Sequence, residues 1–131
     1  MSLERELHRL NRNMIAFDLA LGTGALLAPS QTLRVLGHDE PSADAEHLFR
    51  RCGPIWLTFA AAHLVAHRRR RRRDWWALSW LRGTELLTDV VWSRSAAFSR
   101  PGARAGMWFA GLSNLAMTIG FAHLARDADG A

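Results

Sequence analysis

The stretch AGMWFAGLSNLAMTIGFAHLA, residues 105–125, decides the expected fold, because its 21 residues carry no formal charge. About 20 consecutive apolar residues are enough for a helix to cross the hydrocarbon core of a bilayer. The helix that this stretch would form has large apolar side chains on every side. Such a helix lies either in lipid or deep inside a protein, and a 131-residue chain has little interior to offer. The stretch therefore favours a membrane protein.

Three further segments have the composition of helices, and none shows the alternation that is typical of a strand. The sequence predicts an all-α fold, a four-helix transmembrane bundle that forms a single domain over residues 1–131. The expected spans are residues 14–34, 48–66, 75–92 and 105–125. Pro29 is expected to end or kink the first span. Ser42 to Asp44 offer oxygen atoms that can cap the start of the second helix.

A soluble four-helix bundle is the alternative architecture. Mean hydropathy is −0.08, which is low for a membrane protein, and the expected spans are short. Much of this polarity, however, lies in the ends and loops of the chain rather than in the apolar segments. Residues 55–62 are also apolar all round, whereas a soluble helix would show a charged face opposite its apolar one. The membrane bundle is therefore preferred.

The arginines indicate how the chain would lie in a membrane. Lysine is absent, and ten arginines lie on the side of the expected bundle that holds both termini and the run of six at residues 68–73. Four lie on the opposite side. Because arginine-rich flanks stay in the cytoplasm, we expect a multi-pass protein of the bacterial inner membrane with both termini and the Arg68–Arg73 loop cytoplasmic. The bacterial source is inferred from the bias toward Ala, Leu, Gly and Arg.

The arginine run also suggests partners. A basic loop between two spans attracts anionic lipid headgroups, so membrane lipids are the expected partner. No aromatic side chain interrupts the run, which removes the stacking platform that single-stranded nucleic acid would use. No nucleic acid is therefore expected. A lipophilic small molecule and a second copy of the chain remain open as partners.

Arg82, Glu85 and Asp89 make the third expected span the candidate functional segment. Their spacing places them within an arc of about 60° on one helix face. Each charge costs roughly 2.5–3.5 kcal/mol near the centre of a membrane helix, so this face must turn toward neighbouring helices. We expect Asp18 to pair with Arg82 and Asn114 to be a polar partner of the same face. The alternative is that Arg82 neutralises Glu85 and the charges only hold the helices together.

Glu85 and Asp89 are the candidate catalytic residues. Two carboxylates at i and i+4, away from bulk water, disfavour double ionisation. One of them, Asp89 in preference, is expected to be protonated at neutral pH, where it can load a transported proton or protonate a lipophilic substrate. The alternative is that water reaches Asp89 from the outer end of the span, close to Trp92.

Three other features are weaker candidates. Arg50 can pair with Glu46 at i and i+4, either as part of an anion-binding rim or as a snorkelling arginine. His63 and His67 have a spacing that metal ligands use, but His67 adjoins the arginine run, and no metal site is expected. The single cysteine, Cys52, excludes an intramolecular disulfide and a cysteine zinc cluster. No motif for a cofactor is present, and none is expected.

The chain resembles the small four-helix bacterial membrane proteins of the DoxX-like sort. The resemblance rests on size, on the four expected spans and on FRRCGPIWLTF, residues 49–59, in which an arginine-glycine segment begins a span. LRGTELLTDVVW, residues 81–92, is more charged than that group leads one to expect. The resemblance implies no activity and transfers no site residue.

Three classes of function remain open on the sequence. The first is a proton-coupled transporter or an accessory subunit with a protonatable site. The second is a membrane-embedded enzyme that uses acid catalysis on a lipophilic substrate, as an isomerase, cyclase or epoxide-opening enzyme does. The third is a structural partner protein, in which the charges serve packing alone.

Overall fold

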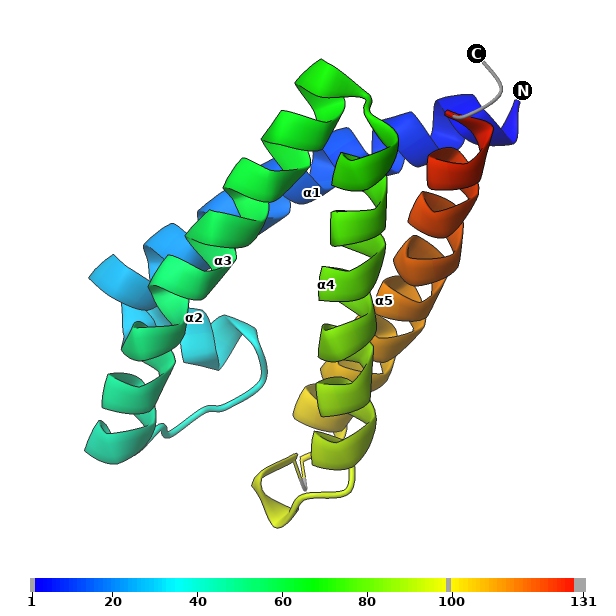
Figure 1. Cartoon of the computed structure of the whole chain (residues 1–131). Helices are drawn as coiled ribbons and strands as arrows, with labels where there is room; N and C mark the ends of the chain where they lie inside the picture. Colours follow the sequence, from blue (N-terminus) through cyan, green and yellow to red (C-terminus); the bar gives the residue numbers. More distant parts are fainter. Residues whose placement is uncertain (1, 99, 129–131) are drawn as a thin grey trace.

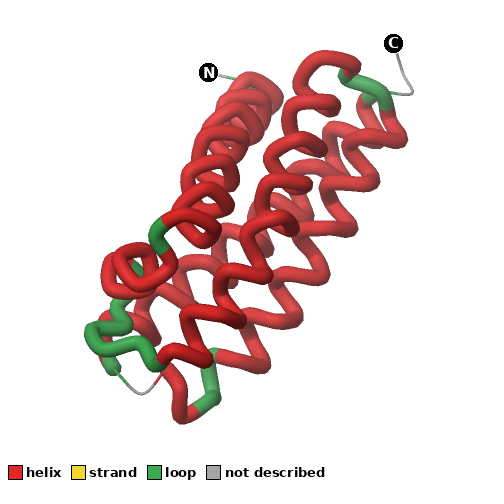
Figure 2. The backbone as a smooth tube through the Cα atoms, turned by 90° about the vertical axis from the view of Figure 1, so that its left-hand side faces the viewer, coloured by secondary structure: helices red, strands yellow, loops and turns green. Residues whose placement is uncertain are grey.

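The computed structural model describes residues 2–98 and 100–128. Within them the protein is all-α, without strands, and its elements are α1 (Leu3–Leu27), α2 (Pro29–Val35), α3 (Ala43–Arg69), α4 (Arg72–Trp92), the 3-10 turn η1 (Ala96–Phe98) and α5 (Pro101–Asp127). The four long helices run alternately in opposite directions (Figure 1). The start of α1, the α3–α4 turn and the end of α5 lie together at what we call the arginine end. The α2–α3 and α4–α5 connections lie at the other end, the loop end (Figures 1 and 2).

The first expected span, 14–34, is divided between two helices at the proline where an end or a kink is expected. Helix α1 begins earlier, at Leu3, because its first turns are packed and not free: Leu7 and Asn11 are buried. Leu7 packs directly against Gly120 of α5, and a Cβ at that position would require the end of the Leu7 side chain to move. Pro29 ends the helix as predicted, since it has no N–H group to continue the hydrogen-bond ladder, and the short α2 follows.

The arginine run forms a turn of only two residues and not the loop that we expected. Helix α3 begins as predicted after Ser42, whose Oγ accepts a hydrogen bond from the Ala45 N–H at 3.2 Å. It ends at Arg69, and Arg70 adopts a left-handed conformation with φ of 50°. Helix α4 begins at Arg72, so four of the six arginines are helical.

The long helices pack as two close pairs, α1 with α3 and α4 with α5. In the first pair Gly22 and Gly53 let the two backbones meet, because a Cβ on either glycine would lie 2.9 Å from the carbonyl oxygen of the other. In the second pair Ser79 Oγ donates a hydrogen bond to the Thr118 carbonyl at 2.8 Å. Contact between the pairs is sparser, and their ribbons diverge toward the loop end (Figure 1).

The apolar core lies at the arginine end, where all four long helices meet. Its buried members are Leu7, Ala66, Trp75, Leu78, Met117, Phe121, Leu124 and Ala125. Trp75 is 1% exposed and stacks on Phe121, with ring centroids 5.8 Å apart. This core joins the two helix pairs and fixes their relative position.

Among the described helices, α5 alone has the length and the hydropathy of a membrane-crossing segment. Only 28% of its apolar window is buried against the rest of the protein. Charged and polar residues interrupt the other three long helices. The four-span part of the predicted fold therefore stays a prediction.

Candidate functional site

The interior contains polar as well as apolar side chains. The buried polar residues in the described part of the chain are Asn11, Asp18, His63, Ser79, Arg82, Asp89, Ser93 and Asn114. Two groups of them are joined by hydrogen bonds between side chains of different helices. We call Asn11, Asp18, His63 and Arg82 the arginine network, and Asp89 with Asn114 the carboxyl–amide pair.

In the arginine network, Arg82 reaches from α4 across to α1 and α3. Its Nη2 forms an ion pair and a hydrogen bond with Asp18 Oδ2. Its Nε donates to His63 Nε2 at 3.0 Å, and Nη2 lies 2.6 Å from the same nitrogen. The guanidinium carbon lies 5.2 Å from the centroid of the Phe59 ring, within range of a cation–π interaction. The pairing of Asp18 with Arg82 that the sequence predicts is thus present, and it joins the two helix pairs.

The network determines the protonation of His63. A guanidinium can only donate hydrogen bonds, so His63 Nε2 must be the accepting nitrogen. The proton is then on Nδ1, which donates to Asn11 Oδ1 at 2.6 Å. Asn11 Nδ2 in turn donates to the His63 carbonyl at 3.1 Å, which sets the orientation of the amide. His63 is therefore a neutral imidazole, and Arg82 is the cation of the network.

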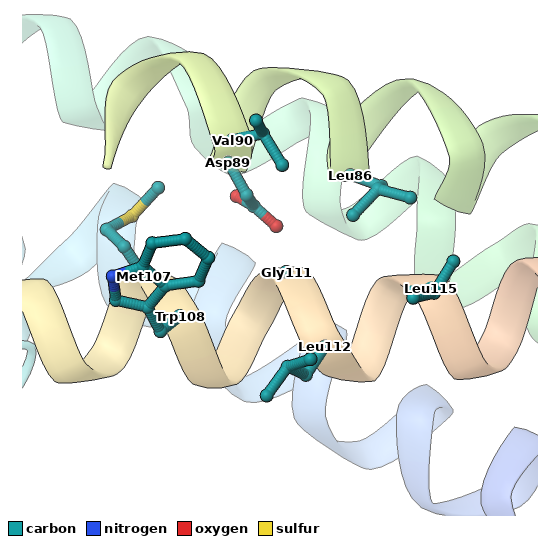
Figure 3. Close-up of a pocket in the computed structure, with 8 residues that line it drawn as sticks. All are labelled: Leu86, Asp89, Val90, Met107, Trp108, Gly111, Leu112 and Leu115. Atoms are coloured by element: carbon teal, nitrogen blue, oxygen red, sulfur yellow. The ribbon is translucent and has the colours of Figure 1, made fainter. Parts of the chain in front are cut away.

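The carboxyl–amide pair joins α4 to α5. Asn114 Nδ2 donates to Asp89 Oδ2 at 2.8 Å, so Asn114 is a polar partner of the charged face, as expected. Beside the pair lies a cavity of about 150 Å³ between the two helices, shown in Figure 3. Its described lining residues are Leu86, Asp89, Val90, Met107, Trp108, Gly111, Leu112 and Leu115. Asp89 is the charged one among them, and its carboxyl group points into the space between α4 and α5 (Figure 3).

Glu85 is not the partner of Arg82, so the alternative pairing within one helix is wrong. Glu85 is half-buried on α4, and in the described part of the chain no cation lies within ion-pair distance of it. The reason is competition: the long Arg82 side chain finds two fully buried acceptors on other helices, Asp18 and His63. Turning back to Glu85 would leave Asp18 as an unpaired buried charge.

Arg50 belongs to neither group. It is exposed on the part of α3 nearer the loop end, and no ion pair with Glu46 is formed. The described residues also contain no group of three or more His, Cys, Asp or Glu side chains that could hold a metal ion. His67 is half-buried and is not part of the arginine network.

Sequence reasoning missed Asn11 and His63 as members of the site. Asn11 lies before the first expected span, and the sequence suggests His63 only by a spacing that metal ligands use. A signal for Asn11 was present: the buried residues of α1 are Leu7, Asn11, Asp18, Gly22 and Ala25, which share one helix face. The buried face of α1 therefore extends toward the N-terminus, beyond residue 14, where the first expected span begins. Nothing comparable in the sequence links His63 to Arg82.

Comparison of the chain with protein-family models, with curated proteins and with solved structures finds no match. The resemblance to the DoxX-like proteins therefore stays a prediction.

Proposed function

We propose that this protein is a multi-pass protein of the bacterial inner membrane that acts as a proton-coupled transporter or as an accessory subunit of one. The observation that carries the proposal is that large apolar side chains are exposed on the surface while an ion pair is buried in the interior. Asp18 and Arg82 are 0% and 3% exposed, whereas Trp80 and Phe109 are 75% and 74% exposed. Soluble monomers rarely expose large contiguous apolar surfaces, and lipid is the solvent that such a surface suits.

The exposed apolar side chains extend along the outer faces of the helices and are not confined to one patch. On α4 and α5 they are Trp76, Trp80, Leu87, Val90, Val91, Trp92, Trp108, Phe109, Leu112, Leu115 and Ile119. Helices α1 and α3 add Leu3, Phe17, Leu19, Leu27, Leu48, Ile55 and Val65. Both helix pairs thus present apolar surface outward, which supports more than one span. The arginine end would then lie among anionic headgroups.

A proton-binding role follows from the charges that remain inside. Asp18, Glu85 and Asp89 are three carboxyl groups, and Arg82 supplies one positive charge because His63 is neutral. The ion pair with Arg82 compensates Asp18. Glu85 and Asp89, one turn apart on α4, would leave two like charges in a region of low dielectric constant, which is unfavourable. Binding of a proton by one of them relieves this repulsion.

Infrared titration of the full chain in lipid tests the proton site. We expect a protonated-carboxyl band at neutral pH that disappears in Asp89→Asn or in Glu85→Gln. Glu40→Gln, which changes an exposed loop carboxyl, is the matched control and should leave the band unchanged. If the parent protein shows no such band, both carboxyl groups are ionised and the protein has no protonated site at neutral pH. The reading as a structural partner protein would then be preferred.

A membrane-embedded enzyme is the second candidate, and the cavity beside Asp89 is the observation that favours it. A carboxyl group in an apolar cavity can act as a general acid toward an alkene or epoxide of a lipophilic substrate. An isomerase, cyclase or epoxide-opening enzyme would convert the bound molecule, whereas a transporter would release it unchanged. Recovering the ligand after incubation with the reconstituted protein and analysing it by mass spectrometry and chromatography separates the two.

A further inference from the structure

We infer that the cavity beside Asp89 binds a lipophilic ammonium cation, which exchanges with a proton on the Asp89 carboxyl group. The inference rests on the proposed function and deepens it, because it names the class of transported substrate. Three features of the cavity carry it: its size, its access and its uncompensated acid.

The first feature is size and lining. A cavity of about 150 Å³ with apolar walls can hold a molecule the size of benzene. Apart from Asp89, the described lining residues are apolar or glycine. Gly111 faces Asp89, and a Cβ built on it would lie 3.6 Å from the Asp89 Cβ, so the absence of a larger side chain keeps this space open. A single aromatic ring or a short branched hydrocarbon fits these walls.

The second feature is access. Trp108 and Leu112 line the cavity and are 54% and 65% exposed, so its rim lies on the outer face of α4 and α5. In the proposed orientation this face meets lipid. A molecule that partitions into the membrane would therefore reach the cavity sideways, without crossing the apolar core at the arginine end.

The third feature is the uncompensated acid. Asp89 Oδ2 accepts one hydrogen bond from Asn114, and Oδ1 accepts none from the described residues. No cation of the described residues lies within ion-pair distance of Asp89, since Arg82 is engaged by Asp18 and His63. A cationic ligand supplies the missing charge, and the Trp108 ring lines the same cavity as the Asp89 carboxyl group (Figure 3). A neutral ligand of the same shape leaves the carboxylate unpaired, and an anion is repelled.

Cation and proton then compete for one carboxyl group. The charged groups that act on Asp89 are Glu85 and Arg82, both on α4, while α5 faces it with the neutral Asn114. Asp18 of α1 acts on Glu85 in turn. When the cation binds, the proton of Asp89 leaves to water, and when a proton binds, the cation is released. The affinity for the cation should accordingly weaken as the pH falls.

The experiment uses the full chain in detergent, with empty micelles as the blank, and benzylammonium, a single ring with one ammonium group, as the probe. Ethylbenzene, which has the same shape without the charge, is the matched neutral compound. Calorimetric titration should show saturable binding of the cation and binding of the neutral compound that is weaker by about tenfold or more. Affinity for the cation should decrease as the pH is lowered from about 8 to about 5, where carboxyl groups take up protons.

Two variants test the residues. Asp89→Asn removes the charge and should weaken binding of the cation by about tenfold or more. Asp74→Asn makes the same change at the far end of α4 and should leave the affinity unchanged. Gly111→Val keeps the acid but fills the cavity, and it should abolish binding while circular dichroism shows an intact helical fold. It serves as the second test if Asp89→Asn does not fold.

Equal binding of the cation by the parent and Asp89→Asn, or equal binding of both compounds, overturns the inference. A protein that stays in carbonate-washed membranes and keeps its carboxyl band, yet does not bind the cation, also overturns this inference but leaves the proposed function standing. A protein recovered as a soluble monomer without detergent overturns the proposed function itself.

Discussion

The arginine network should be the part of the protein that is most sensitive to single substitutions, and Asp18→Ala tests this directly. The substitution removes the carboxylate that pairs with Arg82 and leaves the guanidinium buried. Asp18 is fully buried and Arg82 nearly so, so solvent screens the pair very little. Breaking a buried ion pair by removing one partner costs about 3–5 kcal/mol. His63 still accepts from Arg82 in the variant, which places the expected loss near the lower bound, about 3 kcal/mol.

The assay is thermal unfolding of the full chain in detergent, followed by circular dichroism. A loss of about 3 kcal/mol corresponds to a fall in Tm on the order of 10 °C for a chain of this size. Asp18→Asn keeps the shape and one acceptor, so its loss should be smaller. Glu85→Ala is the matched control on the facing helix, and it should cost less than about 1 kcal/mol because no buried ion pair is broken.

The two alanine variants also distinguish the pairing of Arg82 with Asp18 from a pairing of Arg82 with Glu85. From the sequence alone, Glu85 is the alternative partner of Arg82, and in that pairing its loss would cost as much as a broken buried pair. A Tm for Asp18→Ala equal to that of the parent would refute the reasoning. So would a loss in Glu85→Ala as large as that in Asp18→Ala.

Two further predictions concern topology and packing. Reporter fusions after Arg73 and after Ala131 should both report the cytoplasm, because the arginine-rich end of a membrane bundle stays inside; a periplasmic signal at either point contradicts the four-span arrangement. Gly22→Ala should destabilise the protein by about 1–3 kcal/mol, since its Cβ would lie 2.9 Å from the Gly53 carbonyl oxygen. Gly106 is the control, because a Cβ at this position meets nothing within 4 Å. Gly106→Ala should instead stabilise α5 by about 0.5–1 kcal/mol in the same unfolding measurement. Equal effects of Gly22→Ala and Gly106→Ala would argue against close backbone packing of α1 on α3.

The sequence by itself determined the helical elements, because local chemistry decides them. Ser42 caps α3 and Pro29 ends α1, and each acts through its own backbone or side-chain geometry. The charged face of α4 likewise required that Arg82 and Asp89 turn inward, as they do. The burial of the first turns of α1 depends on packing between helices, because Leu7 contacts Gly120 of α5 and Asn11 bonds to His63 of α3. The length of the arginine turn could not be predicted, since a helix can continue through arginines.

Only the tertiary structure decided between Asp18 and Glu85 as the partner of Arg82, and only it added His63 and Asn11 to the network. Glu85 follows Arg82 at i+3 on α4, so the sequence spacing makes it a neighbour of Arg82 on one helix face. The backbone contact between Gly22 and Gly53 holds α1 against α3, and so brings Asp18 and His63 to the same point opposite Arg82. Ion pairs and hydrogen bonds act over a few ångströms, whereas sequence spacing reports neighbours on one helix only. The site is therefore a property of how the two helix pairs meet.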